Sequence, residues 1–437
     1  MSKSPNTQLN RRHLLQALAA GASVWATPAV WPQSSGAILN IATKGLNEPA
    51  RGQLGAQSRL VIVFLRGAYD GLSAFVPHGD KSYYGLRPNI AIPAPDGTAQ
   101  TTIKLDDQFG LHPAMAALQP LWEQGVIGVV PAAGSPDPSR SHFDAQLHWE
   151  TGMPGLSRAS AGWLNRLAAP GTRTSAVGVG EANPLILAGP ASVQLVPKGL
   201  AATRQGVLGD ERTRQAVMNL YAGQDMLSKA FRAGADSRRQ TAQALSTDAA
   251  PAMMGTSEMV AANNGAGSPQ GLLLDAKHLG TLMRQDRSLR LGFLSAGGWD
   301  THANQGASTG ALAQNLGNLA SALVQLRRDF SQDNDVVVVC SEFGRTSAEN
   351  GTRGTDHGHG NAMWLMGNAV QGGQWHGQWS GLQPGQLHEG RDLPVHHDFR
   401  AVLAQVLQRS QGLTRPAIDA LFPGFAWDHS LNGLMRA

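Results

Sequence analysis

The sequence predicts an α/β protein built around a mostly parallel sheet. Three short apolar runs carry this prediction: residues 59–65 (RLVIVFL), 289–294 (LRLGFL) and 336–339 (VVVV). Continuous aliphatic and β-branched runs of this length are typical of strands buried on both faces of a parallel sheet. The leucine stripe of residues 311–330 predicts an amphipathic helix between the second and third strands, packed on the core.

Length and composition fit a globular protein with one large domain plus insertions, or two domains. The chain has 437 residues, of which 42% are hydrophobic and 15% charged. These values argue against a coiled coil and a disordered chain. The formal net charge is +4, and the sequence holds no dense basic patch, so we expect no nucleic-acid partner. Cys340 is the single cysteine, which excludes an intramolecular disulfide.

The N-terminus predicts export. Arg11 and Arg12 precede a weakly apolar stretch rich in Ala and Gly, which is the pattern of a twin-arginine signal peptide. A short amphipathic helix with a basic start is the alternative. We expect a signal peptide over residues 1–29, a linker over 30–57 and a periplasmic or secreted protein. The apolar stretch is too short for a stable membrane span.

The folded domain is expected over residues 58–437. A helix within 106–125 and a strand at 126–130 follow the first strand, and the three form a strand–helix–strand unit. Such a unit predicts a right-handed crossover to a parallel neighbouring strand. A mainly helical insertion is expected around 205–285, where the sequence carries no concentration of chemically active residues.

Acidic and imidazole side chains follow each of the three buried strands. The candidates are Asp70 after residues 59–65, Asp300 and His302 after 289–294, and Glu342, Asp356, His357 and His359 after 336–339. Open α/β sheets bind their ligands at the carboxyl ends of the strands. We therefore expect these side chains to gather at one edge of the sheet.

A metal ion would explain this gathering. Converging carboxylates repel one another without a cation and raise one another's pKa values. Mixed Asp/His ligation favours zinc or manganese over calcium, so we expect one or two divalent ions. Such ions activate a nucleophile and stabilise charge on a phosphoryl or sulfuryl oxygen. Arg66, Arg140 and Arg345 are candidates for binding a tetrahedral anion through bidentate hydrogen bonds.

Ser141 stands near the start of a predicted helix, after a proline-rich loop. A hydroxyl there has support from the helix dipole for a developing negative charge. A serine at a helix start is also an ordinary N-cap. Ser141 is therefore a candidate nucleophile or a cap. A Ser-His-Asp hydrolase is disfavoured because the Gly-x-Ser-x-Gly elbow is missing.

Five segments in this order resemble the domain-of-unknown-function family 1501: the twin-arginine leader, FLRGAYDGLS, SRSHFDAQ, GGWDTHANQ and CSEFGRT…GTDHGHGN. That family is grouped with the alkaline phosphatase and sulfatase superfamily. The resemblance implies a three-layer α/β/α sandwich with a metal centre at the strand ends. It also implies that Asp70 and the pair Asp300 and His302 are ligands, and that Ser141 is the nucleophile.

One position departs from the superfamily's pattern. An Asp-His pair usually follows the penultimate core strand directly, whereas Glu342 and Phe343 stand there in this chain and Asp356-His357 comes after a loop. Either Glu342 takes the role of the carboxylate while the loop supplies imidazoles, or Asp356-His357 folds back into place.

Together these features predict an exported metal-dependent hydrolase of phosphate or sulfate esters with a serine nucleophile. Its substrate would be a small-molecule or a polymer ester. The alternative is a non-catalytic exported protein of the same fold, with a structural role or a partner protein in the cell envelope.

Overall fold

The computed structural model describes residues 58–153, 161–168, 175–246 and 263–437; the predicted signal peptide (1–29) and linker (30–57) lie outside these ranges. Within them the strands form a large sheet and a small one. The large sheet contains β1 (Leu60–Leu65), β5 (Ile127–Gly134), β6 (Ala176–Gly180), β7 (Val193–Pro197), β8 (Leu291–Ala296), β9 (Val336–Cys340), β10 (Asn361–Met366), β11 (Gln374–Trp375) and β12 (His397–Asp398). The small sheet contains β2 (Phe75–Val76), β3 (Ile103–Lys104) and β4 (Gly110–Leu111).

The large sheet is mostly parallel, with β1 near its middle. Its order is β11-β5-β10-β9-β1-β8-β6-β7, and β12 also pairs with β5. β1 is parallel to β8 and to β9, and every residue of β1 is buried. β10 is antiparallel to both of its neighbours, β5 and β9. β1, β5, β8 and β9 therefore run in the same direction and end at the same edge.

β5 is not the neighbour of β1. The prediction of a crossover from β1 to an adjacent parallel strand was wrong, because β9 and β10 lie between β1 and β5. The apolar segment NAMWLM at Asn361–Met366 forms the fully buried strand β10 and fills that place. The connecting helix is also irregular, with a 3-10 turn at Pro113–Leu118 followed by the short helix α5 (Gln119–Glu123).

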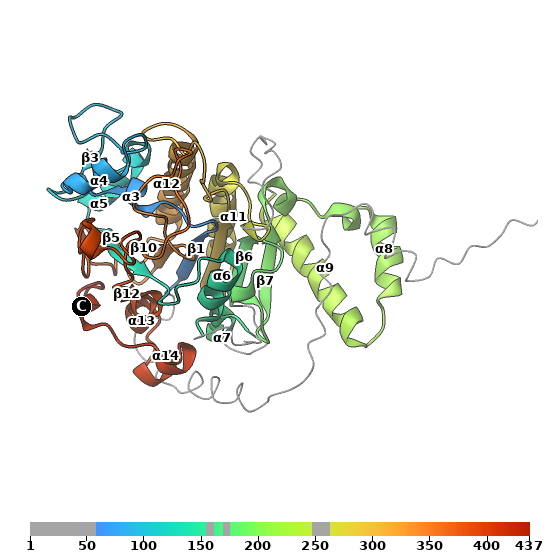
Figure 1. The fold of residues 1–437 in the computed structure, drawn as a ribbon. Helices are drawn as coiled ribbons and strands as arrows, with labels where there is room; N and C mark the ends of the chain where they lie inside the picture. Colours follow the sequence, from blue (N-terminus) through green and yellow to red (C-terminus); the bar gives the residue numbers. More distant parts are fainter. Residues whose placement is uncertain (1–57, 154–160, 169–174, 247–262) are drawn as a thin grey trace, which may run out of the picture.

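Helices cover both faces of the large sheet, which confirms the three-layer α/β/α sandwich (Figure 1). Alternate residues of a strand point to opposite faces, so Ile62 and Phe64 pack in one core while Val61 and Val63 pack in the other. The first core includes residues of α6 (His142–Thr151), α7 (Trp163–Leu167), α13 (Phe399–Ser410) and α14 (Arg415–Leu421). The second includes residues of α11 (Leu272–Gln285) and α12 (Ala311–Asp329). Two short helices, α3 (Gly71–Ala74) and α4 (Lys81–Leu86), follow β1.

Two helices of the expected insertion lie to one side of the sandwich, and the second contacts α11 and β7 (Figure 1). The two helices are α8 (Glu211–Leu220) and α9 (Met226–Ala244), and Leu208, Val217 and Tyr221 form a small core between them. α11 lies inside the expected insertion but packs on β6 and β8 as part of the sandwich.

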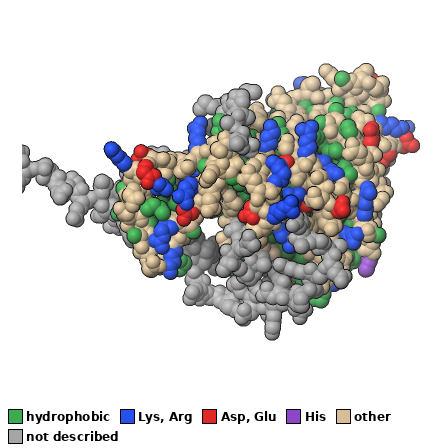
Figure 2. Space-filling view, turned by 180° about the vertical axis from the view of Figure 1, so that it is seen from behind, with side chains coloured by type: hydrophobic (Ala, Val, Ile, Leu, Met, Phe, Trp, Pro, Cys, Tyr) green, Lys and Arg blue, Asp and Glu red, His purple; other side chains and the backbone are tan. Residues whose placement is uncertain are grey.

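One face of the molecule is mixed in charge (Figure 2). On the face seen from behind in Figure 2, Lys and Arg side chains lie in several separate places with Asp and Glu side chains among them. Among the described residues, no helix combines the length and apolar character needed to cross a membrane.

Candidate metal centre

Three segments that follow strands of the large sheet meet at its carboxyl edge. The turn after β8 brings Asp300 and His302, and Gly298 in this turn adopts a φ of 85°. The loop after β9 brings His357, which forms an isolated β-bridge with Arg345. The loop after β5 leads into α6, whose first residue is His142. This edge is where a parallel sheet is expected to place a ligand site.

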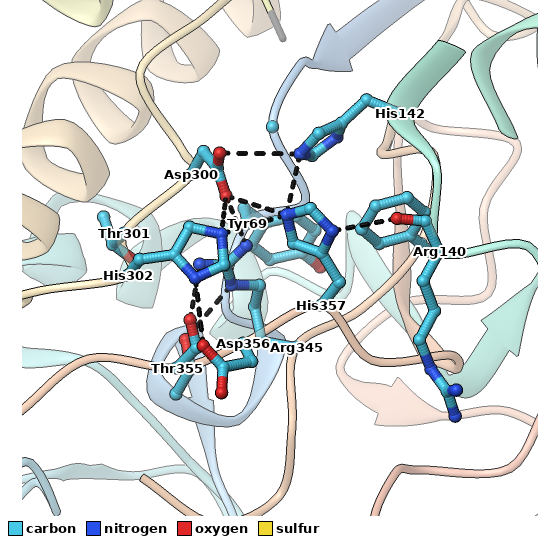
Figure 3. A network of polar contacts seen from close by, with 12 residues as sticks. Tyr69, Arg140, His142, Asp300, Thr301, His302, Arg345, Thr355, Asp356 and His357 are labelled. Atoms are coloured by element: carbon cyan, nitrogen blue, oxygen red, sulfur yellow. Dashed lines mark hydrogen bonds and ion pairs between the residues drawn. The ribbon is translucent and has the colours of Figure 1, made fainter. Parts of the chain in front are cut away.

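Four side chains converge at this edge (Figure 3). The Nε2 atom of His357 lies 3.0 Å from the Nε2 atoms of both His142 and His302. It lies 3.2 Å from Oδ1 of Asp300. The Nε2 atom of His302 is 2.9 Å from the same oxygen, and the Nε2 atom of His142 is 3.6 Å from Oδ2 of Asp300. Tetrahedral ligand atoms at zinc–nitrogen distances of about 2.1 Å lie roughly 3.4 Å apart. His142, Asp300 and His357 each offer a ligand atom within 4.8 Å of the others, which suits one cation, and His302 adjoins this group through His357 and Asp300.

Each of the three imidazoles is held from behind by an oxygen atom. The pairs are His142 Nδ1 with Glu342 Oε1 at 2.7 Å, His302 Nδ1 with Asp356 Oδ1 at 3.0 Å, and His357 Nδ1 with the Arg140 carbonyl oxygen at 2.8 Å. Carboxylate and carbonyl oxygens only accept hydrogen bonds, which assigns the proton of each neutral ring to Nδ1. Three Nε2 lone pairs then face one another beside a carboxylate. Such outer partners are characteristic of metal-ligating histidines.

Charge also concentrates at this centre. Burial would raise the pKa of Asp300, but hydrogen bonds from His142, His357 and Arg345 outweigh it and lower this pKa far below its ordinary value. Burial would lower the pKa of His142, but its bonds to Asp300 and Glu342 raise that pKa to about 9. A proton on His142 can therefore offset the carboxylates without a metal, and a cation that binds must displace this proton.

The centre is open to solvent on one side. The side chain of His302 is 42% exposed, whereas those of His142 and Asp300 are 9% and 13% exposed. Arg345 is fully buried behind Asp300 and donates to its Oδ1 over 2.7 Å. A ligand could therefore reach the four side chains from the side of His302.

Two of the other predicted ligands support the histidines instead of joining them. Glu342 is fully buried and holds His142, as described above, while its Oε1 also accepts from the backbone N–H of Gly67. Asp356 is half-exposed, holds His302 and accepts from Nδ2 of Asn350. Both carboxylates therefore form hydrogen bonds to ligand histidines and do not face the centre themselves. The sequence offered either Glu342 or the Asp356-His357 pair as ligands, and neither alternative describes this arrangement fully.

Asp70 and His359 lie outside the cluster. Asp70 is buried and forms a two-armed ion pair with Arg87, at 2.6 and 3.1 Å. Burial would raise the pKa of Asp70, but Arg87 lowers it, so this carboxylate is already neutralised. The ring of His359 packs against His388, with the two centroids 4.6 Å apart.

The predicted anion-binding arginines are engaged by carboxylates. Arg140 pairs with Glu389 and Asp392, each at 2.7 Å. Arg345 pairs with Asp300. Arg66 is buried against Glu150 and Glu181.

Ser141, the candidate nucleophile, is the N-cap of α6. Its hydroxyl oxygen accepts a hydrogen bond from the backbone N–H of Asp144 at 3.4 Å.

His142 is the residue of the cluster that the sequence reasoning missed. It follows β5 at the first position of α6, in the SRSHFDAQ segment from which the sequence suggested only Arg140 and Ser141. The usable signal was its place after the strand predicted at 126–130, which runs parallel to β1 and ends at the same edge of the sheet. The candidate ligands were drawn only from the segments after the other three strands.

The comparisons agree with the family resemblance. The family described as "Protein of unknown function (DUF1501)" matches residues 57–422. The chain belongs to this family. None of the curated proteins matches the sequence.

The chain is also similar, at low identity, to several solved structures. The alkaline phosphatase of the Antarctic bacterium TAB5 is 12% identical, with a TM-score of 0.36, and the match covers 82% of this chain and 100% of the enzyme. A protein of the alkaline phosphatase superfamily from Vibrio parahaemolyticus is 11% identical, with a TM-score of 0.36 and coverage of 77% and 70%. The PsFucS1 sulfatase from Pseudoalteromonas is 12% identical, with a TM-score of 0.38 and coverage of 92% and 78%.

Proposed function

We propose that this protein is a metal-dependent hydrolase in which His142, Asp300, His302 and His357 hold one divalent ion, zinc or manganese. The observation that carries the proposal is the convergence of three Nε2 atoms on a carboxylate, with every Nδ1 held by an oxygen. Three imidazoles and one carboxylate are ligands that suit zinc or manganese. Asp70, the further ligand that the family resemblance implies, is already paired with Arg87, so we propose one ion.

The proposed substrates are esters of phosphate or sulfate. A divalent ion supplies Lewis-acid stabilisation of the charge that develops on a phosphoryl or sulfuryl oxygen. The protein's own residues would orient the reaction: Glu342 and Asp356 fix the rings of His142 and His302, and Arg345 fixes Asp300. The exposed side of His302 would admit the ester.

Ser141 is the proposed nucleophile. It precedes His142 in the chain and caps α6, where unpaired backbone N–H groups favour a negative oxygen. Its Oγ would form a bond to phosphorus or sulfur while the bond to the leaving alcohol breaks, and its proton would end on that alcohol. Water would then release the phosphate or sulfate and restore the serine. We further propose that the twin-arginine leader exports the protein to the periplasm or beyond.

Metal analysis combined with hydrolysis assays tests this function. The full chain should contain one zinc or manganese per molecule and should hydrolyse p-nitrophenyl phosphate or p-nitrophenyl sulfate. His142→Ala should lose metal and activity together. His396→Ala is the matched control, because this half-buried histidine bonds Ser380 and lies outside the cluster. Metal-free wild-type protein would contradict the centre, and metal-loaded protein without hydrolysis would favour a non-catalytic role.

A further inference from the structure

Gln305 lies between two ion pairs, Asp70 with Arg87 and Asp300 with Arg345. Its side chain is fully buried in the loop after β8. Its amide nitrogen donates to Oδ2 of Asp70 over 2.7 Å. Its amide oxygen accepts from the hydroxyl groups of Thr355, at 3.1 Å, and Thr301, at 2.8 Å. Gln305 therefore lies between the Asp70–Arg87 pair and Thr355.

Thr355 continues the connection to the metal centre. Its hydroxyl oxygen accepts from Nε of Arg345 at 3.1 Å, and its carbonyl oxygen accepts from Nη2 of Arg345 at 2.7 Å. Nη1 of Arg345 is left to donate to Asp300. Two arms of the guanidinium thus rest on Thr355, and the third arm is aimed at the carboxylate of the centre (Figure 3).

The direction of every hydrogen bond in this chain of contacts is fixed. An ionised Asp70 only accepts, so the amide nitrogen of Gln305 must face it and the amide oxygen must face Thr355. The hydroxyl proton of Thr355 then points at Gln305, and a lone pair points at Arg345. At the far end, Arg87 also donates to the backbone carbonyl oxygens of Thr346 and Ser347, directly after Arg345. The chain therefore has an anchor at one end and the centre at the other.

We propose that Gln305 is a positioning residue of the metal centre: it orients Arg345 through Thr355, and Arg345 orients Asp300. The proposal rests on the metal site proposed above. It gives Asp70 a role as the anchor of this chain of contacts. Partners behind a ligand commonly govern metal affinity by about 10–100-fold when removed.

Cobalt(II) binding to the full chain tests the proposal, because Co²⁺ absorption reports both affinity and ligand geometry. Gln305→Leu keeps the approximate volume and removes all hydrogen bonds of the amide. It should bind Co²⁺ about 10-fold more weakly than wild type and with a shifted visible spectrum. Gln405→Leu is the matched control, since Gln405 is another buried glutamine, and it bonds Asp428 and Asn432. This variant should lose some stability and bind Co²⁺ like wild type.

Thr355→Val provides a second, smaller change, because it removes only the hydroxyl between Gln305 and Arg345. It should weaken Co²⁺ binding and shift the visible spectrum in the same direction as Gln305→Leu. If Gln305→Leu does not fold, Thr355→Val tests the positioning role in its place. Wild-type affinity and spectrum in a folded variant of either kind would overturn the positioning role. Wild-type protein that does not bind Co²⁺ would instead reject the metal site itself.

Discussion

Glu342 acts at the scale of a single residue by fixing one imidazole. Its carboxylate is fully buried and accepts from His142, from the backbone of Gly67 and from Nε2 of Gln146. Burial raises the pKa of Glu342, but the hydrogen bond and charge of His142 overcome this effect and lower it. The group is therefore held ionised, and it can serve only as an acceptor for His142.

Glu342→Gln is expected to weaken metal binding about 10–100-fold. Oε1 accepts from His142, Gly67 and Gln146 while Oε2 accepts from Ser341. An amide is uncharged and places a donor at one of these two positions, so it can no longer accept from all four groups. Isothermal titration with zinc measures the change. Asp356→Asn is the matched comparison and should have a smaller effect, since Asp356 is half-exposed. Equal affinities for wild type and Glu342→Gln would contradict the orienting role.

Residue types at strand ends predicted part of this centre and not the rest. Asp300, His302 and His357 were expected together because each follows a buried strand, and the structure brings them together. Asp70 looked equivalent in the sequence. Its role depends on Arg87, whose guanidinium reaches it only through the fold of the segment after β1. Tertiary partners of this kind leave no local pattern in a sequence.

At the scale of one element, the start of α6 allows a test that distinguishes the two roles of Ser141, helix cap and nucleophile. As a cap, Ser141 stabilises α6, and Ser141→Ala should cost about 1 kcal/mol in unfolding free energy while Ser141→Gly costs a few tenths. If Ser141 is the nucleophile, neither alanine nor glycine can substitute for its hydroxyl group. Both variants should then lose hydrolysis while retaining zinc. Urea unfolding and p-nitrophenyl phosphate or sulfate turnover measure the two effects. Activity in Ser141→Gly close to wild type would leave only the cap.

Asp275, in the first turn of α11, should make the stability of the protein depend on pH. Burial raises the pKa of Asp275 from 3.8 to about 7, against smaller opposing effects of the Gly199 N–H and of Lys198. The folded state then holds a proton that the unfolded state releases above about pH 4. This group's contribution to stability is complete below pH 3.8 and is lost as pH rises towards 7.

Asp275→Asn should therefore be more stable than wild type at pH 8, by an amount on the order of a few kcal/mol. The amide oxygen can still accept from Gly199, and no charge is buried. The advantage should shrink as the pH falls to 4.5. Urea unfolding at both pH values measures it, and a difference that is the same at both would contradict the assigned cause.

The existence of the central strands could be predicted from local sequence, but the order of the strands in the sheet could not. β1, β8 and β9 were predicted because their side chains are apolar on both faces. The place of β5 was predicted wrongly, because β10 inserts between β5 and β9 in the antiparallel direction. No local feature of NAMWLM specifies that insertion.

At the scale of the whole molecule, the centre exists only when the sandwich is assembled. Its ligands come from α6, from the turn after β8 and from the loop after β9, so the unfolded chain should bind metal weakly. Free zinc at 100 times its dissociation constant should raise the unfolding free energy by about 2.7 kcal/mol. Thermal unfolding with zinc and with a chelator measures this, and His142→Ala should show no zinc effect.

The most direct test of the central claim is anomalous diffraction at the zinc edge from crystals of the zinc-loaded protein. We predict one strong peak, enclosed by the Nε2 atoms of His142, His302 and His357 and by the carboxylate of Asp300. A peak beside Asp70 or His359, or crystals of zinc-loaded protein with no peak among these four side chains, would contradict the account.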